Sequence, residues 1–194
     1  MKRTIAALIL LVYFLLSLSG EAATLCYKIM VDGEEHGRLT AICNRQSNED
    51  YSLKLNTRLQ FFLLNIESDI YVEFRNGMLL RAGFNKTING VETENTEIVK
   101  HGNGLHLSGS DIDTRFISGN VAFSVGCLYH SEPKSKDTIL SERLGEKVLV
   151  TRIADSKYML HLPDGQTNTY TYKNGICTSM QTRNRGKSVV FILI

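Results

Sequence analysis

Side chains able to do chemistry are few in this sequence and are scattered along it. Asp111 and Asp113 are spaced to share one face of a strand, and two neighbouring carboxylates can act as a general acid and a general base. The pair also follows Gly109 at an expected turn, where aspartates commonly bond to the backbone. The turn role is the favoured interpretation. We predict no catalytic residue, and no Gly-x-Ser-x-Gly elbow offers a nucleophile.

The histidines do not form a pattern that would hold a metal ion. The chain has five of them, on different expected elements: His36, His101, His106, His130 and His161. Only His101 and His106 are close in sequence, and a separation of five places them on opposite faces of one strand. We therefore predict no metal site. No cofactor is predicted either, because no phosphate-binding glycine-rich loop opens a helix.

A short charged segment offers two interpretations. Glu142 and Glu146 flank Arg143 just before an expected strand at 147–153. The three residues could form a charged lip that faces a partner, or an ion pair that fixes the turn before the strand. The structural role is favoured, because charged residues beside a turn are usually structural or solvated.

The first residues are typical of a secretory signal peptide. Lys2 and Arg3 precede an apolar run over 5–16, which small residues follow, and cleavage is expected between Ser19 and Ala23. The apolar run is shorter than the roughly 20 residues of a spanning helix, so no transmembrane anchor is expected after cleavage. The prediction is a signal peptide over 1–23 and one domain over 24–194, exported to the periplasm or cell surface or secreted.

Export would place the four cysteines in an oxidising compartment. Cys26 and Cys43 flank an expected turn, and they are directly opposed if the loop is centred between Glu34 and Glu35. Opposed residues approach to about 4.5 Å between their α-carbons, which a disulfide tolerates. We predict this Cys26–Cys43 disulfide. The alternatives join Cys26 or Cys43 to Cys127 or Cys177, or leave four buried thiols.

Six Asx-Gly pairs punctuate the chain, and each is the preferred pair for a two-residue hairpin turn. They are Asp32-Gly33, Asn76-Gly77, Asn89-Gly90, Asn103-Gly104, Asp164-Gly165 and Asn174-Gly175. Apolar and polar residues alternate between them, most plainly over 51–59 and 66–75. This period of two indicates strands with one buried and one solvated face.

The predicted fold is all-β: a single strongly curved antiparallel sheet, a barrel or a rolled sheet, of about ten to twelve short strands. One short helix is expected near 118–130, capped by Ser118, although Gly119 and Gly126 disfavour a helix interior. The last strand, over 189–194, is apolar on both faces. It should therefore lie inside the sheet and not at its edge.

A concave sheet face could hold a small apolar molecule or a lipid. The candidate ligand-binding residues are Leu53, Leu55, Ile70, Val72 and Phe74. The alternative is an envelope or surface protein that acts through macromolecular contacts and has a filled core, and an exported hydrolase ranks third. Nucleic acid is not an expected partner, because the formal net charge is only +2 and no dense basic run is present.

The C-terminal half also resembles a known family. The residues that carry the resemblance are Ser141 to Glu146, Tyr158, Leu162 to Gly165, Asn168, Tyr170 and Tyr172 to Ile176, with the opening strand to Gly37 and the hairpin over 74–77. They are similar to a domain-of-unknown-function family of exported β-rich proteins found mainly in Bacteroidota. The resemblance implies export and a rolled antiparallel sheet. It supplies no catalytic residues, and the cysteines are not part of its pattern.

Overall fold

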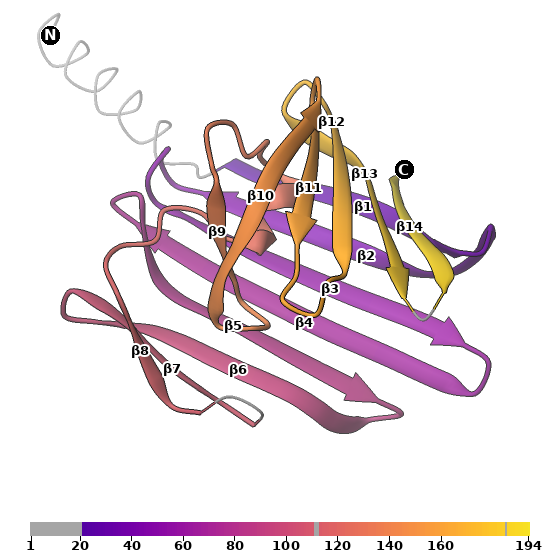
Figure 1. The fold of residues 1–194 in the computed structure, drawn as a ribbon, viewed down its shortest axis with the longest axis horizontal. Coiled ribbons are helices and arrows are strands. Elements are labelled where there is room, and N and C mark those ends of the chain that lie inside the picture. The colour runs from indigo at the N-terminus through magenta and orange to yellow at the C-terminus, as the bar shows by residue number, and fades with distance from the viewer. Residues whose placement is uncertain (1–20, 111–112, 185) are drawn as a thin grey trace, which may run out of the picture.

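The computed structural model describes residues 21–110, 113–184 and 186–194, and the predicted signal peptide lies almost wholly outside them. The described chain forms one antiparallel sheet and a short 3-10 helix (Figure 1). Its elements are β1 Glu21–Val31, β2 Glu34–Arg45, β3 Tyr51–Phe61, β4 Leu64–Arg75, β5 Met78–Ile88, β6 Val91–His101, β7 Gly104–Gly109, β8 Arg115–Ser118, η1 Val125–Tyr129, β9 Thr138–Ser141, β10 Glu146–Ala154, β11 Lys157–His161, β12 Thr167–Lys173, β13 Ile176–Asn184 and β14 Lys187–Leu193. No helix among these residues is long and apolar enough to cross a membrane.

The sheet consists of two meanders joined by the first and last strands. Its order is β8-β7-β6-β5-β4-β3-β2-β1-β14-β13-β12-β11-β10-β9. Strand β14 pairs with β1, where Tyr27 lies opposite Leu193, and with β13, where Met180 lies opposite Phe191. The expected interior position of the last strand is confirmed. In Figure 1 the long strands β2–β6 form a broad layer, and β9–β12 cross in front of it.

The all-β antiparallel class is confirmed, but two details of the prediction are wrong. The described sheet has 14 strands, and it is not closed, because its two edge strands, β8 and β9, do not pair with each other. One of the strands beyond the expected number, β9, is only four residues long and therefore has no readable alternation. The helix expected near 118–130 is a 3-10 helix that covers only Val125–Tyr129. Ser118 ends β8 instead of capping a helix, and Gly119 turns the backbone away with φ +89°.

Four of the six Asx-Gly pairs form the expected tight turns. In these four pairs the Asx residue has a φ between 50° and 53°, and the glycine after it also has a positive φ. The pairs are Asp32-Gly33, Asn76-Gly77, Asn89-Gly90 and Asn174-Gly175. The other two pairs differ. The turn near 103 occupies Gly102 and Asn103, so that Gly104 begins β7. Asp164-Gly165 lies in a longer loop closed by a hydrogen bond from Leu162 N to Gln166 O at 2.9 Å.

The turn between β9 and β10 brings the two sheet edges together without extending the hydrogen-bond ladder. Thr96 of β6 donates its hydroxyl to Arg143 O at 3.0 Å, and Arg115 of β8 donates to Leu144 O at 2.8 Å and to Gly145 O at 3.0 Å. Side chains therefore connect edges that backbone pairing leaves open. The turn thereby borders one side of the interior between the two meanders.

Candidate functional site

An open cavity of about 410 Å³ lies between the two meanders. One wall comes from β2–β5 and the other from β11–β14, with η1 and the β9–β10 turn at its side. Its principal apolar residues are Leu39, Leu55, Ile70, Phe84, Leu160, Tyr170, Met180 and Phe191. We call this space the inner cavity. Its polar lining residues are Thr57, Ser68, Ser141, Arg143, Glu146, Asp164 and Asn168. A largely apolar wall with some polar groups is suited to a molecule that has an apolar part.

A second space, of about 670 Å³, adjoins the inner cavity. The two share Arg143 and Asp164 as lining residues, and the second is otherwise bordered by the far ends of the long hairpins. Its apolar residues are Val31, Leu59, Phe61, Leu64, Ile66, Ile88 and Val189. We call it the outer cavity. Together the two spaces form a route from the hairpin ends to the interior.

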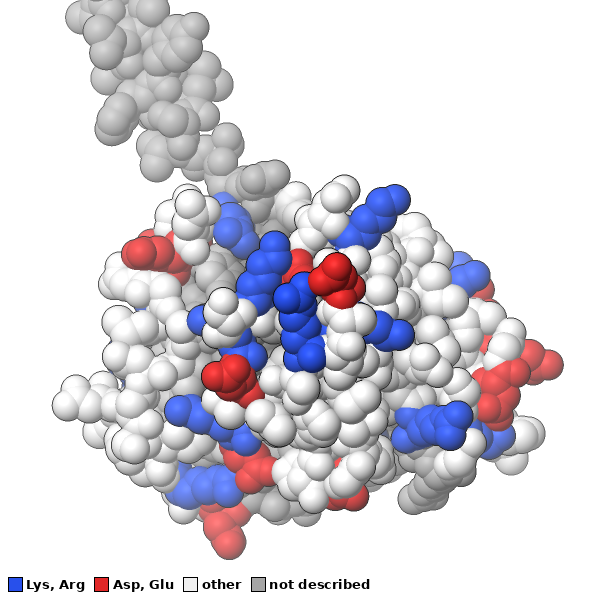
Figure 2. Space-filling model, turned by 45° about the horizontal axis from the view of Figure 1, so that its top comes forward, with Lys and Arg blue, Asp and Glu red and all other residues white. Residues whose placement is uncertain are grey.

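Charged side chains gather where the two cavities meet. Glu94 accepts hydrogen bonds from Lys86 Nζ and from Arg143 Nε, both at 2.6 Å. Burial raises the pKa of Glu94, but the two cationic donors outweigh it and lower that pKa overall. Arg143 is thereby held at the junction, where its guanidinium can contact the polar end of a bound molecule. On the wider surface basic and acidic side chains are interspersed, as the face in Figure 2 shows.

The five candidate ligand-binding residues divide into two groups. Leu55 and Ile70 are paired across β3 and β4, and both line the inner cavity. Leu53, Val72 and Phe74 are at most 3% exposed and do not line it. They belong to the packed core, where Phe74 stacks on Tyr51 with ring centroids 4.7 Å apart. The cavity therefore occupies only part of the length of these strands.

Residues of the opposite wall were missed by the sequence argument. Leu160, Tyr170 and Met180 come from three consecutive strands of the C-terminal meander. Their alternation is visible in the sequence, and it shows that they face inward. It does not show which strands they face, because the contact between the two meanders depends on how far the whole sheet curls.

Glu142 is fully buried and does not form a lip. Its Oε1 accepts a hydrogen bond from Gly126 N at 2.9 Å, which anchors η1, and its Oε2 has no hydrogen-bond partner among the described residues. Burial raises the pKa of Glu142 and outweighs the hydrogen bonds from Ser124 and the backbone that lower it. Arg143 pairs with Glu94 instead of Glu142, and Glu146 lies 3.9 Å from Arg115. The three charged residues therefore have separate partners.

The cysteine register expected from the sequence is wrong. Cys26 is exposed and lies opposite Thr40, whereas Cys43 is buried and lies opposite Ala23. The hairpin turns at Asp32-Gly33, and a register shift at Ile29/Met30 does not move its centre as far as the predicted pairing needs. Cys127 and Cys177 are buried thiols, and burial raises the pKa of each to about 12. They are therefore uncharged and poor nucleophiles at neutral pH.

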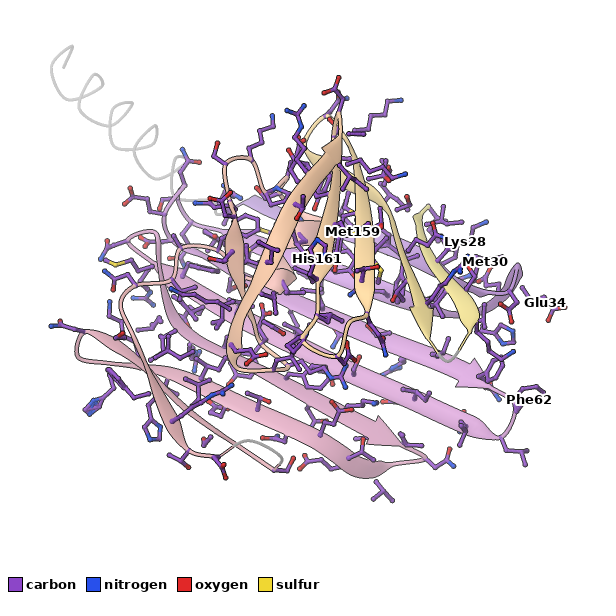
Figure 3. The ribbon with its side chains drawn as sticks, viewed as in Figure 1. Lys28, Met30, Glu34, Phe62, Met159 and His161 are labelled. Atoms are coloured by element: carbon purple, nitrogen blue, oxygen red, sulfur yellow. The ribbon has the colours of Figure 1, made fainter. Side chains whose placement is uncertain are left out.

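The other candidate groups remain apart. Among the described residues, no three His, Cys, Asp or Glu side chains are grouped so that they could hold a metal ion. Asp111, half of the paired carboxylates, lies outside the described residues. His161 lies on β11, where it approaches Thr151 Oγ1 at 3.0 Å (Figure 3).

Comparisons with known proteins define the family and the fold. No curated protein matches the chain in sequence. The crystal structure of a β-barrel-like protein of the domain of unknown function DUF1849, from Brucella abortus, matches with a TM-score of 0.58. The match covers 91% of this chain and 96% of that one at 11% identity, so it supports the fold alone. The model of another family, described as a domain of unknown function, matches residues 27–194, and the chain therefore belongs to that family, DUF6134.

Proposed function

We propose that this protein is a binding module that holds a small apolar molecule, or the apolar tail of a lipid, in the inner cavity. The observation that carries the proposal is the size and lining of that space. Its volume of about 410 Å³ falls within the roughly 300–1,000 Å³ of small-molecule sites. Its two walls present aliphatic and aromatic side chains to each other.

The solvation of the cavity supports the same function. The cavity is open, so water can enter it when no ligand is bound. Apolar walls offer water few hydrogen bonds, so they favour an apolar occupant.

The polar groups at the junction of the two cavities give such a ligand an orientation. Glu146 and Asn168 also line the inner cavity, and Arg143 and Asp164 border both spaces. A molecule with one polar end would place its apolar part in the inner cavity and its polar end beside these two side chains. A few polar groups in an otherwise apolar site commonly fix orientation in this way.

Titration with a fluorescent fatty acid tests the proposal. We expect saturable binding by the unmodified protein and at least tenfold weaker binding by Ile70→Phe, because the larger ring would occupy the inner cavity. The control is Tyr71→Phe, the next residue on the outward face, which should bind as the unmodified protein does. If the unmodified protein does not bind, or if Ile70→Phe binds equally well, the inner cavity is not a ligand site.

We also propose that the protein acts outside the cytoplasm, because its first residues are typical of a secretory signal. Intact-mass analysis of protein purified from its native host should give a mature chain that begins between Gly20 and Thr24. A mass that retains Met1 to Leu16, or that includes acyl chains on Cys26, would contradict this proposal.

A further inference from the structure

The turn between β3 and β4 places two large apolar side chains in solvent. Phe62 is 82% exposed and Leu63 is 91% exposed, and both lie at the projecting end of a long hairpin, where Figure 3 labels Phe62. Leu64, the first residue of β4, is 43% exposed and extends the same apolar surface. Exposed apolar side chains gathered at one point commonly mark a contact site.

The backbone makes this choice of residues more unusual. Phe62 has a φ of 54°, in the left-handed region that bulky side chains disfavour. The same position in four other tight hairpins is occupied by Asp or Asn before a glycine, at Asp32, Asn76, Asn89 and Asn174. Asn adopts this φ more readily than Phe does, so an asparagine at position 62 would form this turn with less strain. Folding alone does not explain a phenylalanine and a leucine here.

The neighbouring hairpin contributes to the same surface. Asn89 N donates to Asn65 O, and Asn65 N donates to Asn89 Oδ1, both at 2.8 Å, so the two hairpin ends are held together. Val91, just past this second turn, is 66% exposed and pairs with Ile88 of the outer cavity. We call Phe62, Leu63, Leu64 and Val91 the apolar tip.

The apolar tip is continuous with the route to the interior. Leu64 pairs with Phe61, and Ile66 pairs with both Leu59 and Ile88; all five side chains line the outer cavity. Two residues further along the same face, β3 and β4 reach the inner cavity at Thr57 and Ser68. A molecule leaving the tip would thus meet apolar side chains along the hairpin until it reached the charged junction.

We propose that the apolar tip inserts into a lipid bilayer and holds the opening of the outer cavity at the membrane surface. The tip is a projection of four side chains, whereas a stable protein interface buries about 800 Å² on each partner. A projection suits the boundary between headgroups and acyl chains better than it suits a flat partner surface. Lys187, whose Nζ lies 5.1 Å from the Phe61 ring centroid and 3.1 Å from Asp32 Oδ2, adds a cationic side chain at this end of the molecule.

Vesicle binding by a turn variant tests this proposal. The double substitution Phe62→Asn with Leu63→Gly replaces the tip by the turn sequence found elsewhere in the chain, so the Tm should stay the same or rise. Binding to vesicles of phosphatidylcholine and phosphatidylglycerol in equal amounts should weaken at least tenfold. The control Val99→Thr removes an exposed apolar residue at the other end of β6 and should leave vesicle binding unchanged.

A fluorescent variant provides a second measurement. The chain contains no tryptophan, so Phe62→Trp introduces a single tryptophan, at the tip. Its emission should shift to shorter wavelength when vesicles are added, and brominated phosphatidylcholine should quench it. An unshifted emission would overturn the proposal. So would equal vesicle binding by the double variant and the unmodified protein, or self-association that the double variant abolishes, which would make a second copy of this chain the partner of the tip.

Ligand binding and membrane insertion can fail independently. The double variant retains Leu55, Ile70 and the opposite wall of the inner cavity, so its affinity for the fluorescent fatty acid in solution should be unchanged. Vesicle binding without fatty-acid binding would contradict the proposed ligand binding and support membrane insertion of the apolar tip. Fatty-acid binding without vesicle binding would support ligand binding and contradict membrane insertion.

Discussion

Phe74→Ala should lower the free energy of unfolding by about 3–5 kcal/mol, the usual cost of removing a buried aromatic ring. Phe74 is 1% exposed, stacks on Tyr51 and does not line the inner cavity. Removing its ring would therefore leave a new void in a closely packed region. Chemical denaturation followed by circular dichroism measures the change.

Leu55→Ala should cost less than a typical buried leucine, close to the lower end of the roughly 2–5 kcal/mol range. Leu55 is 2% exposed, yet one side of it borders open space. The substitution would enlarge an existing cavity and would forfeit fewer contacts. It should also change the affinity for a fluorescent fatty acid, whereas Phe74→Ala should change only stability.

The control for both substitutions is Lys54→Ala, on the exposed face of the same strand as Leu55, which should stay within about 0.5 kcal/mol. Equal losses of several kcal/mol at Phe74 and Leu55 would contradict the division of this face into core and cavity. They would mean that the two meanders close on each other in solution.

This division shows what the sequence could and could not predict. Leu53, Leu55, Val72 and Phe74 follow the same alternation, and the prediction that they face inward agrees with their burial. Whether an inward side chain meets a neighbour or open space depends on the opposite wall. That wall is formed by residues such as Leu160 and Met180, whose distance from β3 no local pattern encodes.

Turns were predictable where the sequence uses the preferred residues and unpredictable where it does not. Asn76-Gly77 and Asn174-Gly175 form tight turns as expected, because their residues favour positive φ. Phe62-Leu63 carries no such signal, so only the gap between two alternating segments indicated a turn there. The proposed membrane contact lies at this position, where the local preference for a turn is weakest.

Register was harder to predict than strand position. Cys26 and Cys43 lie on the two strands that flank the expected turn, but the two residues are not opposed. A cross-strand pairing changes whenever the centre of the loop moves by half a residue. The Asp32-Gly33 turn and the register shift at Ile29/Met30 together set that centre, and the shift has no recognisable signature in the sequence.

Glu142 is the residue whose burial should be most visible in solution. Because burial raises its pKa in the folded protein, the native state binds this proton more tightly than the unfolded chain does. The resulting stability is complete below the ordinary pKa of a glutamate and is lost as the pH rises through the folded pKa. Because only one proton is involved, the free energy of unfolding falls by at most about 1.4 kcal/mol per pH unit.

Glu142→Gln should remove this pH dependence, because glutamine can still accept the hydrogen bond from Gly126 N but cannot ionise. Denaturation curves measured between about pH 5 and pH 8 should therefore diverge, with the unmodified protein losing stability relative to the variant. Burial lowers the pKa of His130, so its effect on stability has the opposite dependence on pH; this effect is the same in both proteins and cancels in the difference.

Glu142→Leu separates charge from anchoring: without an acceptor for Gly126 it should be less stable than Glu142→Gln by about 1–3 kcal/mol at every pH. Identical pH profiles for the unmodified protein and Glu142→Gln would show that the carboxyl reaches solvent, and that the contact between η1 and the β9–β10 turn opens.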